Sequence, residues 1–235
     1  MADLTFLFAQ MGAGKTASLL STAFHLRHCG QQVTVLTCND RTAGKVTSRL
    51  GIDCDAITLD PDDDPVALLA DQPTPDHVLV DEAQFLTPTC VDRLAHLVDE
   101  HDIDITCYGL RTDFTARLFD GAARLLAIAD RVEQLQVQAR CWCGRPATHN
   151  ARLVNGIQVA DGAQVIVDDG TGEVTYQPLC RRHFTARQPR HQRPANARPD
   201  DATAPVTPAA TAPPDAQPAP RQPAAAATRP PTPVA

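Results

Sequence analysis

The stretch that decides the fold is LTFLFAQMGAGKT, residues 4–16, in which an apolar run leads into a glycine-rich turn and then a helix-forming segment. Such a turn presents backbone N–H groups at a helix N-terminus, where the helix dipole favours anions. Lys15 is spaced to reach the β- and γ-phosphates of a nucleotide, and the Thr16 hydroxyl is spaced to ligate Mg²⁺. We therefore predict that a nucleoside triphosphate with Mg²⁺ binds the loop Ala9, Gln10, Met11, Gly12, Ala13, Gly14, Lys15 and Thr16.

The same stretch opens an alternation of strand-like and helix-like segments. Such alternation predicts an α/β fold, a P-loop (RecA-like) parallel sheet with helices on both faces, whose ligands lie at the carboxyl ends of the strands. The first loop position holds Ala9 where the consensus has glycine, and a small residue should still fit there. The expected strands are Leu4–Phe8, Val33–Thr37, His77–Val80 and Ile103–Tyr108, and the expected helices are Ala17–Cys29, Thr89–Asp99 and Thr115–Ala129.

Composition changes sharply near residue 187. Thirteen of the 20 prolines lie after residue 186, and this segment has too few large apolar side chains to offset the entropy of ordering it, so we expect a disordered tail. The residues before it carry 15 basic and 25 acidic side chains, which argues against a nucleic-acid groove. No signal peptide or membrane-length apolar run is apparent, and five of the eight cysteines are scattered as buried thiols would be. The expectation is a cytoplasmic protein.

A second strand end carries two carboxylates. The run Val78–Val80 is followed by Asp81 and Glu82, the form of a Walker B strand, in which Asp81 would hold the nucleotide's Mg²⁺. Neighbouring strand residues point to opposite faces, so Glu82 is free to act as a base toward the attacking nucleophile. In an ATPase that nucleophile is water, and in a kinase it is a substrate hydroxyl. Spacing alone does not choose between them.

Two cysteine-rich pairs form a candidate metal site. Three thiolates and one imidazole make a complete tetrahedral set for a structural Zn²⁺, although the first pair, C-x-C, is tighter than the common knuckle. The competing interpretation is that the cysteines are core thiols and the histidine is a surface residue. The candidate ligands are Cys141, Cys143, Cys180 and His183.

Taken in order, the phosphate loop, DEAQF at 81–85, YGLRTDF at 108–114 and the Cys/His set resemble the type II, cytosolic-type thymidine kinases, and GKVTSR at 44–49 is a weaker match to the same family. The resemblance covers about residues 3–185. It implies transfer of the ATP γ-phosphate to the 5′-hydroxyl of thymidine, with Glu82 as catalytic base. It adds Gln84, Arg41 and Arg49 to the ATP and Mg²⁺ site that already includes Asp81. It also implies that the nucleoside is enclosed by Met11, Phe85, Leu110, Phe114, Phe119, Asn150 and Tyr176.

The resemblance also implies a kinase domain at 1–139 and a zinc-binding lasso domain at 140–186, and the change in composition adds the tail at 187–235. It favours a homotetramer and dTTP as an inhibitor. The sequence departs from the family pattern at two places in the part that would contact the nucleoside base. Asn150 stands where the family has threonine, and Val165–Gly172 is longer than the family's usual turn. Two alternatives to a nucleoside kinase stay open. One is a zinc-stabilised P-loop ATPase that acts on another macromolecule, and the other is a regulator that binds nucleotides without turnover.

Overall fold

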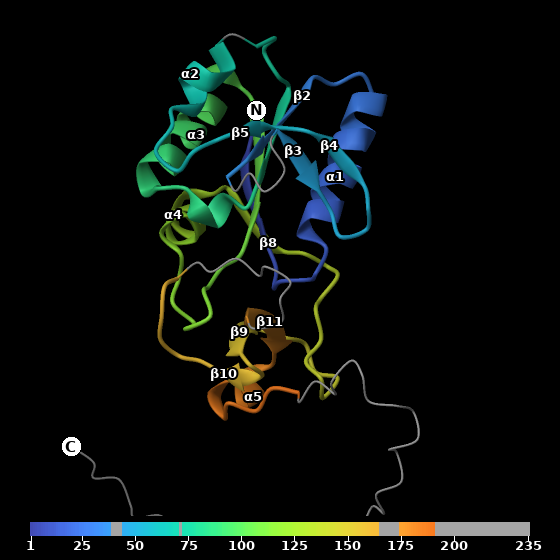
Figure 1. Ribbon diagram of the computed structural model, residues 1–235. Coiled ribbons are helices and arrows are strands. Elements are labelled where there is room, and N and C mark those ends of the chain that lie inside the picture. The colour runs from blue at the N-terminus through green and yellow to red at the C-terminus, as the bar shows by residue number, and fades with distance from the viewer. Residues whose placement is uncertain (39–43, 71, 165–173, 191–235) are drawn as a thin grey trace, which may run out of the picture. The chain divides into compact units, whose positions relative to one another are not determined.

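The computed structural model describes residues 1–38, 44–70, 72–164 and 174–190, and a parallel sheet forms its centre (Figure 1). The six strands of this sheet lie in the order β5-β2-β6-β7-β1-β8, and every neighbouring pair is parallel. The three strands β6, β7 and β1 are therefore neighbours whose carboxyl ends meet at one edge. The strands are β1 Leu4–Phe8, β2 Val33–Thr37, β5 Ile57–Thr58, β6 His77–Asp81, β7 Asp104–Gly109 and β8 Arg131–Gln134.

Helices cover both faces of the sheet, as Figure 1 shows. Successive residues of β6 alternate between two cores because strand side chains point to opposite faces. Leu79 packs with Leu19 of α1, whereas Val78 and Val80 pack with Leu94 of α3. This arrangement confirms the predicted fold class. The helices are α1 Lys15–His28 on one face and α2 Pro65–Ala70, α3 Pro88–His101 and α4 Asp120–Ile128 on the other.

The predicted bounds of the first two strands are confirmed, but the third helix is shorter than expected. It was predicted from Thr115, and α4 begins only at Asp120. The residues between belong to a turn in which Asp113 Oδ1 accepts hydrogen bonds from the backbone N–H of Thr115 at 2.8 Å and of Arg117 at 3.0 Å. A short acidic side chain that bonds nearby backbone groups competes with the helix, and this turn delays its start.

A second, smaller sheet follows in the chain. Its strands β9 His149–Val154, β10 Ile157–Gln158 and β11 Val174–Leu179 are antiparallel, and the short helix α5 Arg181–Thr185 follows them. They enclose a small core of Cys141, Ala151, Leu153, Leu179 and Cys180. The described residues of both sheets fall in one compact unit.

The remaining elements are a hairpin and one short turn. The hairpin pairs β3 Lys45–Thr47 with β4 Asp53–Asp55, and a 3₁₀ turn, η1 Ala83–Phe85, follows β6. Within the described ranges, none of the helices is both long and apolar enough to cross a membrane. The predicted tail lies, from residue 191 on, outside the described residues.

Candidate active site and metal centre

One cavity of about 360 Å³ lies where β1, β6 and β7 end. This is the edge at which ligands bind in parallel α/β sheets. The volume is within the usual range for small-molecule sites. The structure brings most of the predicted site residues together in its lining: Met11, Gly12, Gly14, Lys15, Thr16, Asp81, Glu82, Gln84, Phe85, Leu110, Phe114, Phe119, Asn150 and Tyr176.

The glycine-rich loop has the backbone conformation that its glycines suggested. Gly12 and Gly14 have φ of 74° and 83°, in the left-handed region that residues with a Cβ avoid. Gly14 is also the N-cap of α1 and has no side chain to occupy the helix N-terminus, so the first N–H groups remain available to an anion. Ala9 does not have a positive φ and is almost fully buried, and a methyl group is therefore accommodated at the position where the consensus has glycine.

Three of the predicted loop residues do not line the cavity. Ala9, Gln10 and Ala13 are 3%, 7% and 2% exposed. They belong to the loop but are packed on its protein side, so they hold its backbone in place rather than face a ligand. The backbone N–H of Ala9 donates to the carbonyl of Gly109 at 3.2 Å, and that of Ala13 donates to Gln10 at 3.2 Å. These bonds join the loop to the end of β7 and close its turn.

Buried charges gather around Asp81. Its Oδ2 accepts a hydrogen bond from the Thr16 hydroxyl at 3.1 Å, whereas its Oδ1 is buried without a hydrogen-bond partner in the described residues. Burial, and then the neighbouring charge of Glu82, raise the pKa of Asp81 from 3.8 to about 6. Burial lowers the pKa of Lys15, against the opposing influence of Glu82 and Asp81. The site therefore has an unsatisfied buried acceptor on the carboxylate that contacts Thr16.

Glu82 does not continue the strand, contrary to the geometry assumed from the sequence. It has φ of 55° and caps the η1 turn, so its direction is set by this unusual backbone rather than by strand alternation. Gln84 Nε2 donates to Glu82 Oε2 at 2.7 Å. The Oε1 of Gln84 in turn accepts from the backbone N–H of Leu110 at 2.9 Å. Gln84 thus fixes the Glu82 carboxylate relative to the end of β7.

Apolar and aromatic side chains form the other wall of the cavity. Phe85 and Phe119 meet edge to face with ring centroids 5.6 Å apart, and Phe114 is 3% exposed. Asn150 is buried and its Oδ1 accepts from the backbone N–H of Met11 at 2.9 Å, which ties β9 to the phosphate loop. A flat aromatic ligand would fit such a wall.

Several cavity residues were not predicted as site residues. The hairpin contributes Lys45, Val46, Thr47 and Ser48, and further lining comes from Thr37, Asp113 and Gln164. The segment GKVTSR at 44–49 is only a weak match to the family, Asp113 lies within the motif YGLRTDF at 108–114 without a role assigned to it, and nothing local in the sequence marks Gln164 as a lining residue. Arg41 and the whole of the altered loop Val165–Gly172 lie outside the described residues.

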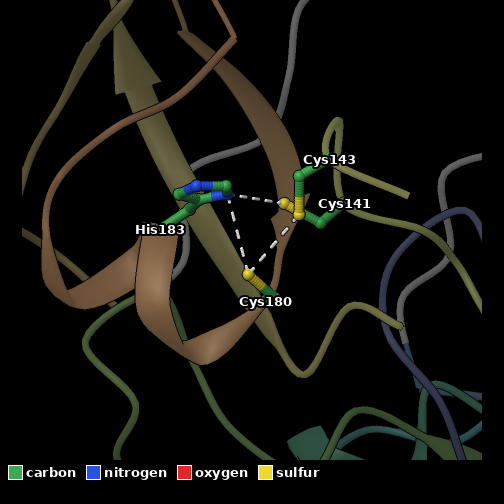
Figure 2. Close-up of side chains that lie close together, drawn as sticks. All are labelled: Cys141, Cys143, Cys180 and His183. Atoms are coloured by element: carbon green, nitrogen blue, oxygen red, sulfur yellow. Dashed lines mark hydrogen bonds between the residues drawn. The ribbon is translucent and has the colours of Figure 1, made fainter. Parts of the chain in front are cut away.

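The four predicted metal ligands come together in a separate cluster (Figure 2). Their donor atoms all lie within 4.8 Å of one another. The Cys143 and Cys180 sulfurs are 3.9 Å apart, and His183 Nδ1 lies 3.3 Å from Cys141 Sγ and 3.6 Å from Cys180 Sγ. A tetrahedron with metal–sulfur bonds of about 2.3 Å has sulfur–sulfur edges of about 3.8 Å, so these separations fit a zinc ion.

Local structure explains how the tight C-x-C pair contributes to this cluster. The backbone N–H of Gly144 donates to the carbonyl of Cys141 at 2.8 Å, and the φ of 83° at Gly144 closes a turn that brings both sulfurs to one side. Trp142 between them stacks on the His183 ring, with centroids 4.2 Å apart and planes at 12°. His183 thus presents Nδ1 to the sulfurs while its ring face is covered.

Comparison with known proteins agrees with this geometry. The family model described as "Thymidine kinase" matches residues 2–184. The chain is 44% identical to the thymidine kinase of Streptomyces avermitilis over 195 residues, which are 80% of this chain and 90% of that relative. It is 41% identical to the thymidine kinase of Cutibacterium acnes over 190 residues, 78% of this chain and 88% of the relative. Because the family model matches most of the chain and the identity extends over most of the relatives' length, the chain belongs to the thymidine kinase family.

Proposed function

We propose that this protein transfers the γ-phosphoryl group of ATP to the 5′-hydroxyl of thymidine. The observation that carries the proposal is that one cavity joins a phosphate loop, two adjacent carboxylates and an aromatic wall. Membership of the family supports thymidine as the nucleoside. No feature of the cavity favours a macromolecular ATPase, since the wall opposite the loop is a buried aromatic pocket.

The phosphate loop forms the donor half of the proposed site. The backbone N–H groups at the start of α1 and the ammonium of Lys15 would hold the phosphates, whose negative charge offsets the cost of burying Lys15. Thr16 and the unpartnered Oδ1 of Asp81 fit a hard cation that prefers oxygen ligands, as Mg²⁺ does. When bound, Mg²⁺ would neutralise charge on the β- and γ-phosphate oxygens.

Glu82 is the proposed catalytic base. As the 5′-oxygen forms its bond to the γ-phosphorus and the bond from that phosphorus to the bridging oxygen of ADP breaks, the Glu82 carboxylate would accept the proton of the 5′-hydroxyl. The hydrogen bond from Gln84 at 2.7 Å occupies Oε2 and leaves the other carboxylate oxygen of Glu82 to take the proton. Glu82 also lies next to Asp81 in the chain, so the base and the proposed cation ligand share one strand end.

The aromatic wall is the proposed acceptor half. Phe85, Phe114 and Phe119 would enclose the thymine ring, and Leu110 and Met11 would contact its edge. The Oδ1 of Asn150 is already engaged by the phosphate loop, which leaves its amide N–H₂ to donate toward a carbonyl of the base. Tyr176, from β11, completes the lining.

The proposal has further parts outside the cavity. Residues 140–186 would be a lasso domain with a structural zinc ion at the Cys₃His group, and its separate small core supports that division from a kinase domain at 1–139. A homotetramer and inhibition by dTTP are proposed from the family resemblance alone, whereas a tail at 187–235 and a cytoplasmic location are proposed from the composition of the chain.

A nucleoside panel with a matched pair of variants tests the proposal. Purified protein with Mg-ATP is offered thymidine, deoxyuridine, deoxycytidine and a purine nucleoside, and both ADP and the nucleoside monophosphate are measured. Thymidine should give equal amounts of the two products. Glu82→Gln should lower kcat by about 10²–10⁴-fold with little change in ATP affinity, since it removes the base and keeps the shape.

The control is Glu100→Gln, which changes an exposed glutamate on α3 and should leave turnover unaltered. ADP formation that ignores every nucleoside would overturn the kinase proposal in favour of an ATPase. Tight thymidine binding without any turnover would replace it with the regulator interpretation. Equal activity of Glu82→Gln and Glu100→Gln would leave the kinase activity in place and remove Glu82 as its base.

A further inference from the structure

Arg152, in the middle of β9, is a buried arginine. It is 1% exposed, and no ion pair joins it to an acidic side chain within the described residues. Its guanidinium donates from Nη1 to the carbonyl of Ala163 at 2.6 Å, from Nη2 to that of Gln164 at 2.8 Å, and from Nε to the Tyr176 hydroxyl at 2.9 Å. Burying such a group has a desolvation cost that only several good hydrogen bonds offset.

The same guanidinium lies over an aromatic ring of the cavity. Its central carbon is 3.7 Å from the centroid of the Phe114 ring, a close cation–π contact. Phe114, Tyr176 and Gln164 all line the cavity, and they come from three segments that are distant in the sequence. Arg152 touches all three at once, although it does not itself line the cavity.

A second contact closes the network. Gln164 Nε2 donates to Asp113 Oδ2 at 3.2 Å, while the other oxygen of Asp113 holds the turn that carries Phe114. The segment at 163–164 is thus fastened to the Phe114 turn from two sides, through Arg152 and through Asp113. Within the described residues, the hydrogen bonds of Arg152 do not reach the phosphate loop, so this network belongs to one half of the cavity.

We infer that Arg152 is a positioning residue for nucleoside specificity: it aligns Phe114, Tyr176 and the 163–164 backbone into one wall and does not touch the substrate. The inference rests on the proposed function, because it assigns this wall to the nucleoside base. The planar fork of arginine matches three acceptors in fixed directions, and a lysine ammonium cannot reproduce this. Buried charged networks of this kind specify geometry more than they add stability.

The test compares Arg152→Met, Arg152→Lys and the control Arg124→Met, which changes an arginine on α4 that pairs with Asp92 at the surface. Thymidine and a non-hydrolysable ATP analogue are titrated calorimetrically into each full-length protein. Arg152→Met should weaken thymidine binding at least about tenfold and leave the ATP analogue within about twofold. Arg152→Lys should fall in between, and the control should match the unaltered protein.

Hydrogen exchange in the ligand-free proteins separates this inference from the proposed function. Arg152→Met should speed amide exchange at least about tenfold in peptides covering 110–119 and 174–179, with no change at 9–20. If the unaltered protein binds no thymidine, the proposed function fails, while exchange still decides whether Arg152 holds the wall. A parallel loss of both ligands, or unchanged exchange and unchanged thymidine affinity in a folded variant, would overturn the inference. Should Arg152→Met not fold, Arg152→Lys carries the same two readouts.

Discussion

Replacing Asp81 by asparagine should stabilise the ligand-free protein while it abolishes turnover. Asp81 is 5% exposed, and one of its oxygens has no partner in the described residues. Asparagine has nearly the same shape and keeps an oxygen that accepts from the Thr16 hydroxyl, so the present contact at 3.1 Å survives. What the substitution removes is the buried charge. The proposed cation site loses its carboxylate, so catalysis should fail.

The size of the effect follows from the pKa of Asp81. Its rise from 3.8 to about 6 means that the folded state binds the proton more tightly than the unfolded state. Below pH 4 both states are protonated and the carboxyl carries no penalty. As the pH rises from about 4 to 6, only the unfolded state ionises, so the free energy of unfolding falls. Above pH 6 the penalty levels off at about 3 kcal/mol, from roughly two pKa units at about 1.4 kcal/mol each.

Thermal unfolding of Asp81→Asn and the unaltered protein between pH 4 and pH 8 provides the measurement. At pH 7 the melting temperature of the variant should be about 5–10 °C higher, and the gap should close toward pH 4. Asp99→Asn, at an exposed position on α3, is the control and should show no such gap. Excess Mg-ATP should narrow the difference at pH 7, because only the unaltered protein gains from binding. A gap that is absent at pH 7, or that widens as the pH falls, would refute the reasoning.

Three further predictions concern the metal centre, the packing and the base. Chelation of zinc should alter the fluorescence of Trp142, the one tryptophan in the chain, because it stacks 4.2 Å from His183; an unchanged spectrum after metal loss would contradict the stacked site. Gly121→Ala should lower the free energy of unfolding by about 1–3 kcal/mol in chemical denaturation, since the new Cβ would lie 2.6 Å from a backbone oxygen. Gln84→Leu should lower kcat about tenfold or more with unchanged ATP affinity, because Glu82 loses its partner at 2.7 Å; full activity would show that Gln84 does not orient it.

Features of the site that depend on short stretches of chain could be predicted from the sequence. The phosphate loop is one continuous segment, and the conformations of Gly12 and Gly14 follow from the absence of a Cβ. Asp81 ends a run of buried apolar residues, so the strand end was visible as a change in hydropathy. The two cysteine pairs also carry a local spacing signal, although their meeting in space needed the structure.

The rest depends on partners that are far apart in the chain. The contacts of Gln84 with Leu110 and of Arg152 with Gln164 join residues 26 and 12 positions apart and leave no periodic trace in the sequence. The positive φ of Glu82 is likewise set by the turn that follows the strand, since nothing in a glutamate side chain favours it. The scattered cysteines were expected to be buried, yet Cys29 is exposed, because it caps the solvent end of α1.

The two halves of the cavity are stabilised in different ways, and this difference bears on how the site works. At the donor half, Lys15 and Asp81 place charges in a buried site where they are incompletely compensated, so the ligand-free protein gives up stability that phosphates and a cation would restore. At the acceptor half, by contrast, protein oxygens accept hydrogen bonds from Nε, Nη1 and Nη2 of Arg152 without any ligand. We therefore expect the nucleoside wall to be formed before any ligand arrives and the phosphate half to tighten on binding. Hydrogen exchange should then slow more in peptides covering 9–20 when the ATP analogue binds than in peptides covering 110–119 when thymidine binds.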